Sequence, residues 1–170
     1  MVRKIKVVPH DPKWKKKFIL EARIIKSIFN QEILAIYHIG STAIPEISAK
    51  PIIDILVEVH NIDVIDDYNA KMIEQDYIPK GEFGIPRRRY FIKGSEEFRT
   101  FHVHVFEKGN PEITRHLNFR NYMIAHPKKA QEYSQLKEKL VREYPENING
   151  YINGKDSFIK NIDKKARDWR

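Results

Sequence analysis

The sequence predicts an α+β (mixed α/β) fold in a single domain, with short strands flanked by helices and a helical C-terminal part. Three stretches, residues 32–39, 52–59 and 99–107, carry the alternating or continuous apolar pattern of strands. Helically spaced apolar residues precede the first of them and return from residue 111 onward. The 170 residues, 41% hydrophobic and 32% charged, are enough to bury one core, so we place one domain over residues 1–170.

The composition indicates a basic protein with an anionic partner. A net charge of +8 and a pI near 9.5 favour a nucleotide, a phosphorylated small molecule or RNA, although a solvated basic surface would give the same values. The absence of cysteine excludes disulfides and thiolate metal sites and agrees with a cytoplasmic location. No apolar run approaches the roughly 20 residues that cross a bilayer, and we expect neither a membrane span nor a signal peptide.

The N-terminal segment is expected to contain a short strand and a helix. Residues 4–8 are the strand candidate. Asp11 followed by proline is a typical helix start, because the carboxylate can cap free amides and proline suits the first turn. The apolar stripe of this helix consists of Trp14, Phe18, Ala22, Ile25 and Phe29.

A turn of small residues ends the strand at residues 32–39. Gly40 lets the backbone approach a ligand closely, and the Ser41 hydroxyl and the amides that follow, beginning at Thr42, can donate hydrogen bonds to phosphate oxygens. An ordinary turn is the alternative interpretation. Lys50, held extended by the proline after it, can either reach an anion or remain solvated.

One carboxylate interrupts the most apolar strand, residues 52–59. Alternation places Asp54 on one face together with Leu56 and Glu58. Asp54 is either a metal ligand or proton acceptor, or it is a structural acid paired with a lysine or an arginine. The Gly-Ser turn before it favours a functional role.

Three consecutive arginines enter a further strand, after a helix expected at residues 61–75 and a short strand or turn at residues 77–79. Alternation puts Arg87 and Arg89 on one face and Arg88 on the other. Arginine binds phosphate in a bidentate manner, so these side chains are candidates for a triphosphate or a nucleic-acid backbone. A solvated strand edge is the alternative.

Two histidines share one face of the strand at residues 99–107. His102 and His104 are expected about 6–7 Å apart along the strand. That spacing suits two ligands of one metal ion or two contacts to one phosphate, whereas a single histidine would be interpreted as a core residue. Zinc would need further histidine or carboxylate ligands, because the chain has no cysteine.

The C-terminal part is expected to consist of three helices. The first two cover residues 111–125 and 127–144, and a polar turn at residues 147–154 separates them from the last helix. Arg120 and Lys155 are weaker candidates for anion contacts.

A series of motifs runs along essentially the whole chain. In order they are VVPHDPKWKKKF, HIGSTAIP followed by AKPIIDILVEV, GIPRRRYF, FHVHVFE, RHLNFRNYMIAHP with AQEY, and YINGKDSFI. With these motifs the chain resembles the GrpB family, which is placed in the nucleotidyltransferase superfamily; HIGST followed by AKPIID is the most specific part. Glu46 stands where the family is expected to carry glycine.

The resemblance implies a nucleotidyltransferase-like fold, with a small mixed β-sheet and helices on one side. It also implies a Gly-Ser turn followed by two acids at positions i and i+2, with a third acid on a neighbouring strand. The acids hold two Mg²⁺ ions. Gly40 and Ser41 match the turn, and Asp54 matches the first acid.

The implied two-metal site is incomplete in this sequence. Leu56 occupies the position of the second acid, and Glu58 stands about 13 Å from Asp54 along the strand, too far to share an ion. A histidine, His102 or His104, stands where the third acid is expected. Because Mg²⁺ prefers oxygen ligands, this change argues for another metal, for one metal, or for phosphate binding alone.

We therefore predict a nucleotidyltransferase-type enzyme that binds a nucleotide or a phosphate ester and acts on an unidentified acceptor. The catalytic residues expected are Asp54 and Ser41. The substrate-binding residues expected are Gly40, Ser41, Thr42, Lys50, Arg87 and Arg89. A divalent metal, Mg²⁺, Mn²⁺ or one that accepts histidine, is expected at Asp54, His102 and His104.

Two other functions remain open from the sequence. One is a catalytically degenerate protein of the same fold that binds a phosphorylated ligand or RNA without turnover, which the missing acid favours. The other is hydrolysis at a histidine-bound metal.

Overall fold

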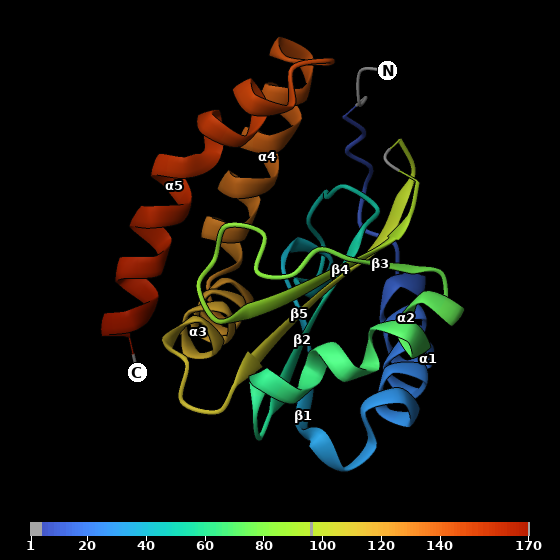
Figure 1. Ribbon diagram of the computed structural model, residues 1–170. Coiled ribbons are helices and arrows are strands. Elements are labelled where there is room, and N and C mark those ends of the chain that lie inside the picture. Colours follow the sequence, from blue (N-terminus) through green and yellow to red (C-terminus); the bar gives the residue numbers. More distant parts are fainter. Residues whose placement is uncertain (1–4, 96, 170) are drawn as a thin grey trace.

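The computed structural model describes residues 5–95 and 97–169 and contains a five-stranded sheet (Figure 1). The strands are β1 (Ile33–Ile39), β2 (Ile53–Val59), β3 (Tyr77–Pro79), β4 (Arg88–Gly94) and β5 (Arg99–Glu107). Their order across the sheet is β1-β2-β5-β4-β3, with β2 and β5 parallel and the other neighbours antiparallel. The predicted mixed sheet is therefore confirmed.

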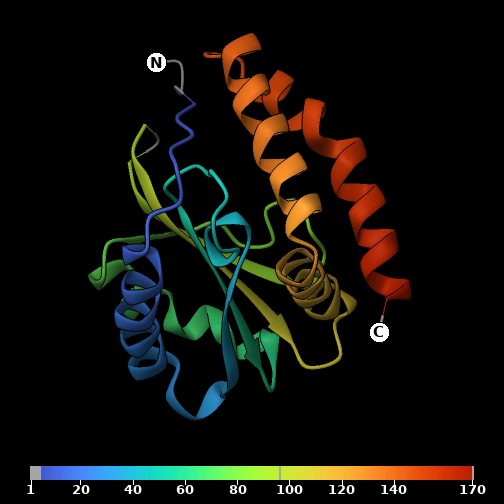
Figure 2. The same cartoon turned by 180° about the vertical axis from the view of Figure 1, so that it is seen from behind.

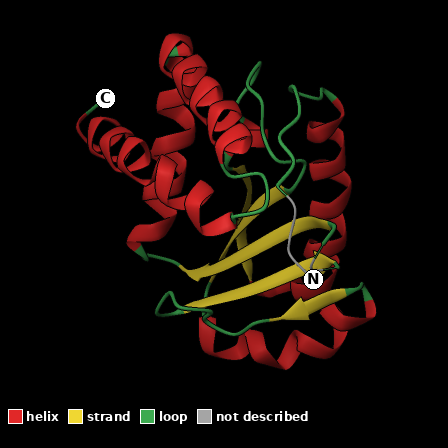
Figure 3. Ribbon diagram, turned by 90° about the horizontal axis from the view of Figure 1, so that it is seen from above, coloured by secondary structure: helices red, strands yellow, loops and turns green. Residues whose placement is uncertain are grey.

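Helices cover both faces of this sheet, so the arrangement with helices on one side is wrong. The α-helices are α1 (Lys13–Phe29), α2 (Asn69–Glu74), α3 (Pro111–Ala125), α4 (Pro127–Glu143) and α5 (Ile148–Asp168). The 3-10 helices are η1 (Asn30–Glu32), η2 (Ser41–Ala43) and η3 (Ile62–Tyr68). In Figures 1 and 3, α1 and α2 lie on one side of the sheet and α3, α4 and α5 on the other.

The main core lies between the sheet and the layer formed by α1, η3 and α2. Alternate residues of β2 and β5 supply it, because a strand turns every second side chain to the same face. The largest contributors from the helices are Trp14, Ile25 and Phe29 of α1, each at most 2% exposed. α1 begins as expected, since the Asp11 carboxylate accepts a hydrogen bond from the Lys13 amide at 2.9 Å.

The opposite face carries smaller apolar clusters beneath the C-terminal helices. Leu56 of β2 and Phe106 of β5 pack against Ile113 of α3. α4 and α5 lie side by side beyond α3 (Figure 2). Within residues 5–95 and 97–169, no helix has both the length and the apolar character needed to cross a bilayer.

The segment at residues 61–75 is not a single α-helix. Its first part is the 3-10 helix η3, which Asn61 caps by accepting a hydrogen bond from the Asp63 amide at 2.9 Å. Ile62, Ile65 and Tyr68 recur at a period of three, which aligns them on one face of a 3-10 helix. A spacing of three fits either helix type, and this is why the sequence alone favoured the commoner one.

The polar stretch at residues 147–154 is also not a turn, because α5 begins inside it. Its two glycines allow α5 to pack closely on α4. A Cβ at Gly150 would lie 2.6 Å from Tyr144 Cδ1, and one at Gly154 would overlap Leu140. The strand expected at residues 4–8 is not formed by residues 5–8, where Val8 makes only an isolated bridge with Ala49. Residue 4 lies outside the described residues.

Candidate functional site

Asp54, His102 and His104 meet on the face of the sheet that carries α3. Asp54 of β2 and His102 of β5 are direct partners in the parallel register, and His104 is the partner of Leu56 two positions further on. His104 Nε2 lies 3.1 Å and His102 Nδ1 3.5 Å from the same oxygen, Asp54 Oδ1. The structure thus brings together the acid and the two imidazoles that the sequence selected.

Arg88 fixes the proton of His104. Its Nη1 lies 3.3 Å from His104 Nδ1, while its other nitrogens donate to the carbonyls of Glu82 and Phe83 at 3.1 and 3.0 Å. A guanidinium can only donate, so His104 Nδ1 must accept. The proton of neutral His104 therefore sits on Nε2, from which it is donated to Asp54.

The two imidazoles keep Asp54 ionised. Burial alone would raise the pKa of Asp54, but hydrogen bonds from His102 and His104 hold it well below its usual range. A carboxylate with so low a pKa is a weak base. Asp54 is consequently suited to holding negative charge rather than to accepting a proton.

The bend at Gly40 closes over this carboxylate. Ile39 pairs with Asp54 across β1 and β2, so the chain leaves β1 directly beside the acid. Gly40 has φ 73°, and a Cβ there would lie 2.8 Å from Asp54 Oδ2. Only glycine combines this left-handed backbone with so close an approach.

The residues after Gly40 connect the bend to its surroundings. Ser41 hydrogen-bonds Tyr133 of α4, whose pKa burial raises to about 12. Thr42 Oγ1 lies 2.8 Å from Nε2 of His38, which stacks on Phe18 at 4.9 Å. His38 therefore belongs to the α1 face and does not join the two histidines of β5.

A cavity of about 110 Å³ opens beside Asp54 and contains three lysines. This volume is well above the ~10–15 Å³ that a single water needs. Its polar lining consists of Ser41, Thr42, Lys50, Asp54, His102, Lys137, Tyr151 and Lys155. We call it the lysine cavity. The loop before β2, α4 and α5 each supply one lysine.

Lys137 is the most unusual side chain of the lysine cavity. It is 1% exposed, and its Nζ has no hydrogen-bond partner among the described residues. Its Nζ lies over the ring of Tyr133, 4.5 Å from the ring centroid. A buried amine that lacks a partner is costly, and it is typical of a site completed by a ligand.

The positive charges of the cavity oppose one another. Burial, followed by the charges of Lys155 and Lys50, lowers the pKa of Lys137 to about 6. Burial also lowers the pKa of Lys155 to about 8, although Asp54 acts in the opposite direction. An anion in the cavity would relieve both effects.

Arg87 and Arg89 are not brought to the lysine cavity. Arg87 Nη1 lies 2.8 Å from Asp63 of η3, and Arg89 Nε lies 2.8 Å from Asp66 of the same helix. The three arginines alternate between the faces as expected. However, Arg88, and not the predicted pair Arg87 and Arg89, lies on the face that carries Asp54. The assignment of Arg87 and Arg89 as phosphate ligands therefore has no support from their position.

The metal site expected at Asp54, His102 and His104 is not formed by side chains alone. In the described part of the chain, no three His, Cys, Asp or Glu side chains are grouped so as to hold a metal ion. Both imidazoles instead direct a nitrogen at Asp54 Oδ1. These three residues consequently do not fit a complete metal centre of their own.

Sequence reasoning missed Lys137 and undervalued Arg88 and Lys155. A signal for Lys137 was present: it falls on the apolar stripe of α4, between Tyr133 and Leu140, where a lysine is out of place. Arg88 could have been recognised once His102 and His104 defined the functional face, because strand alternation assigns it there.

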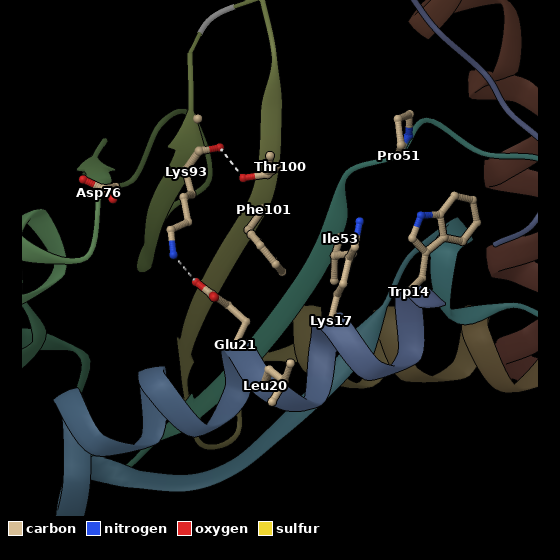
Figure 4. A pocket seen from close by; sticks show the side chains of 11 residues that line it. Trp14, Lys17, Leu20, Glu21, Pro51, Ile53, Asp76, Lys93, Thr100 and Phe101 are labelled. Carbon is tan, nitrogen blue, oxygen red and sulfur yellow. Dashed lines mark hydrogen bonds and ion pairs between the residues drawn. The ribbon is translucent and has the colours of Figure 1, made fainter. Parts of the chain in front are cut away.

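A separate cavity of about 530 Å³ lies on the other face of the sheet, between α1 and the hairpin of β4 and β5 (Figure 4). Figure 4 shows Trp14, Leu20 and Phe101 along its walls and an ion pair between Lys93 and Glu21. The Lys93 Nζ to Glu21 Oε2 distance is 2.8 Å, so these two charges are paired.

Known proteins with similar sequences point to one family. A sequence family described as "GrpB protein" matches residues 4–165. The UPF0157 protein YqkA of Bacillus subtilis is 48% identical over 99% of this chain, which spans 49% of that relative's length. The glutamate-rich protein GrpB of Alkalihalophilus pseudofirmus is 33% identical over 92% of both chains.

One solved structure agrees with the family match. The conserved protein GrpB from Enterococcus faecalis is 42% identical with a TM-score of 0.92, covering 95% of this chain and 96% of that chain. The Cid1 poly(U) polymerase overlaps more weakly, with 13% identity and a TM-score of 0.45 over 79% of this chain and 45% of that chain.

Proposed function

This chain belongs to the GrpB family, and on that fold we propose that the lysine cavity beside Asp54 binds the phosphate groups of a nucleotide or another phosphate ester. The observation that carries the proposal is Lys137, a buried amine without a hydrogen-bond partner among the described residues, in a cavity lined by two further lysines. An isolated buried charge is destabilising, so a site of this kind is favoured when an anion pairs with it.

Each element of the cavity has a defined part in the proposal. Lys50, Lys137 and Lys155 supply positive charge from three separate segments, and the Ser41 hydroxyl can donate a hydrogen bond to a phosphate oxygen. Binding raises the pKa of Lys137, because a nearby anion favours the charged amine. The protein therefore takes up protons when the ligand binds near neutral pH.

Asp54 limits where phosphate oxygens can lie. Its carboxylate is ionised and repels them, which keeps the phosphate on the lysine side of the cavity. A divalent ion, Mg²⁺ or Mn²⁺, would find one protein carboxylate here and would need further oxygens from the bound phosphate. The proposed phosphate binding does not depend on such an ion.

Nucleotidyl transfer is the reaction that the resemblance implies, and binding without turnover is the alternative that one observation favours. Leu56 stands where the resemblance implies a second acid, and it is fully buried. Without a second carboxylate, the residues present account for ligand binding better than for a two-metal reaction. We therefore propose phosphate binding as the primary function.

A terminal phosphate suits the cavity better than an RNA backbone. The space beside Asp54 is about 110 Å³ and is lined by α4, α5 and the bend after β1. A continuous RNA backbone needs an open groove, and its binding depends steeply on salt.

The cytoplasmic location expected from the cysteine-free sequence remains a prediction.

Calorimetric titration of the 170-residue chain tests the proposal. The ligands are inorganic triphosphate, ATP, GTP, CTP and UTP, each with and without Mg²⁺ or Mn²⁺. We expect binding of triphosphate, a loss of at least tenfold in affinity in Lys137→Met, and no change in Lys139→Met, whose side chain is 64% exposed on the same helix.

Three further results of this experiment bear on the proposal. Proton uptake on binding, measured in buffers of different ionisation enthalpy, is expected in the wild type and reduced in Lys137→Met. Release of pyrophosphate from any nucleotide would establish turnover. Failure of every phosphate compound to bind, with or without a divalent ion, would remove the proposal.

A further inference from the structure

Three side chains that line the lysine cavity each carry a buried polar atom without a partner. The atoms are Lys137 Nζ, the Tyr151 hydroxyl oxygen and His102 Nε2, and none of them has a hydrogen-bond partner among the described residues. The three side chains come from different elements, α4, α5 and β5. Buried polar groups are nearly always paired, so three of them around one space indicate a ligand that supplies the missing partners.

Lys137 and Tyr151 supply hydrogen-bond donors to such a ligand. Once an anion favours its charged form, Lys137 can only donate. Tyr151 is fully buried, and burial raises the pKa of its hydroxyl, which therefore keeps its proton. The amines of Lys155 and Lys50 lie over its ring, 4.7 and 5.4 Å from the centroid, so positive charge surrounds this side chain as well. These donors suit the unprotonated oxygens of an anion.

His102 Nε2 is the acceptor of the three atoms. The other ring nitrogen of His102, Nδ1, lies 3.5 Å from Asp54 Oδ1. The Asp54 carboxylate is ionised and can only accept, so the proton of neutral His102 sits on Nδ1. Burial lowers the pKa of His102 against the opposing effect of Asp54, which favours this neutral form. Nε2 therefore presents a lone pair and needs a donor from the ligand.

A buried acceptor among lysines discriminates between anions. Hydrogen phosphate carries one hydroxyl, and a terminal phosphate ester can take up one proton near neutral pH, because its second pKa is about 6. Sulfate has the shape and charge of hydrogen phosphate but carries no proton, and a phosphodiester carries none either. Only a phosphate group with a hydroxyl can donate to His102 Nε2 while its other oxygens accept from Lys137 and Tyr151.

We propose that His102 determines the specificity of the lysine cavity for a phosphate group that carries a hydroxyl, by accepting a hydrogen bond from that hydroxyl at Nε2. The group is free hydrogen phosphate or the protonated terminal phosphate of an ester. This inference rests on the proposed phosphate binding and narrows its ligand. Sulfate or a phosphodiester would leave Nε2 buried and unpaired and would set an anionic oxygen against its lone pair. The role differs from the metal binding that the sequence led us to expect of His102.

Small ions that differ in one hydroxyl test the inference on the 170-residue chain. Inorganic phosphate, sulfate, methyl phosphate and dimethyl phosphate are titrated by calorimetry at constant pH and ionic strength, and weak binding is measured by displacement of inorganic triphosphate. We expect inorganic phosphate to bind at least tenfold more tightly than sulfate, because sulfate leaves a buried acceptor unpaired. Dimethyl phosphate is expected not to bind. The tighter of inorganic phosphate and methyl phosphate identifies whether the site takes the free ion or the ester.

Two substitutions separate the acceptor of His102 from its volume. His102→Phe keeps a ring but has no acceptor, so phosphate and sulfate should bind it with affinities within about twofold of each other. His102→Gln offers an amide oxygen as acceptor and should retain a preference for phosphate. The matched control is His10→Phe, which should keep the full preference. His10 Nδ1 is also a buried nitrogen without a described partner, but His10 packs on Trp14 and is not among the residues that line the lysine cavity.

The outcomes separate this inference from the phosphate proposal. Equal affinities of the wild type for phosphate and sulfate, or a full preference that persists in His102→Phe, would overturn the role of His102 while anion binding by the lysine cavity stands. Bound triphosphate that neither phosphate nor methyl phosphate displaces would overturn that role as well. An absence of binding by triphosphate and by all four ions would overturn both proposals.

Discussion

Two buried ionisable side chains, one on each side of the sheet, differ in whether the fold supplies a partner. On the α1 face, Glu21 is 6% exposed and accepts hydrogen bonds from Tyr77 at 2.6 Å and from Lys93 at 2.8 Å. On the α3 face, Lys137 is 1% exposed and has no hydrogen-bond partner among the described residues. The Glu21 carboxylate thus has its partners within the fold, whereas the Lys137 amine has none among the described residues.

This difference shows why burial alone does not identify a site. Both side chains are charged residues on the buried side of a helix, and a sequence pattern would mark both as anomalies. The distinguishing feature is whether the fold supplies a partner. Where it does, removing the charge should harm the fold; where it does not, removing the charge should help the fold and harm binding.

Glu21→Leu is expected to have the largest effect on stability. It leaves Lys93 and Tyr77 without their acceptor, and breaking a buried pair in this way costs about 3 kcal/mol. Urea denaturation followed by circular dichroism measures the change. The matched control is Glu132→Leu, which removes an exposed pair with Lys129 at 3.1 Å on α4 and should change the free energy of unfolding by about 0.5 kcal/mol or less. Equal effects of the two substitutions would contradict the comparison.

Lys137→Met is expected to act in the opposite direction. At pH 7.5 the folded chain must hold this lysine largely neutral, because its pKa is lowered to about 6. Since one pKa unit corresponds to ~1.4 kcal/mol and the unfolded chain keeps this lysine protonated up to pH ~10.4, burial costs the fold at most about 4 kcal/mol at pH 7.5. Loss of the contact between Lys137 and the Tyr133 ring offsets up to about 2 kcal/mol of this. We therefore expect the variant to gain about 2 kcal/mol of unfolding free energy while it loses triphosphate binding. A loss of stability would show that Lys137 is paired in the fold.

The pH dependence of stability has a defined sign. Between pH 6 and the ordinary lysine pKa near ~10.4, the unfolded chain holds a proton on Lys137 that the folded chain has released. The free energy of unfolding therefore rises with pH over this window, by at most ~1.4 kcal/mol per pH unit from this group. Denaturation at pH 6.5, 7.5 and 8.5 should show a smaller slope in Lys137→Met, with Lys155 contributing the remainder. An identical slope in both proteins would show that Lys137 has an ordinary pKa.

Glu46→Gly is expected to have the smallest effect. Glu46 has φ 64°, a left-handed conformation that costs a non-glycine residue roughly 1–2 kcal/mol. Glycine relieves that strain but loses more chain entropy on folding, so the net gain should be below about 1 kcal/mol. Thermal denaturation measures it, and Glu132→Gly within α4 should instead lose about 1 kcal/mol. Destabilisation by Glu46→Gly would show that its carboxylate has a role in this loop.

The fold followed from the sequence wherever the apolar pattern had one period. β5 and α3 were predicted with the observed bounds, since strict alternation and a proline-led stripe each allow one structure. η3 was not predicted, because apolar residues three positions apart fit both an α-helix and a 3-10 helix. The nucleotidyltransferase part of the fold expectation remains a prediction drawn from the resemblance.

The candidate site was predictable along the strands and not across the helices. Asp54, His102 and His104 could be selected because alternation places each on a known face, and strand pairing then brings them within hydrogen-bonding distance. Lys137 and Lys155 reach the same cavity only through the packing of α4 on α5, which depends on Gly150 and Gly154. The apolar pattern of the sequence does not indicate how α4 and α5 pack on each other.

A crystal structure of the 170-residue chain with inorganic triphosphate would show whether the lysine cavity binds phosphate. We expect a phosphate in this cavity, within hydrogen-bonding distance of Lys137 Nζ and of Ser41, with Asp54 still bonded to His102 and His104. Triphosphate bound to the lysines and arginines of the protein surface, with the cavity holding only water, would contradict it.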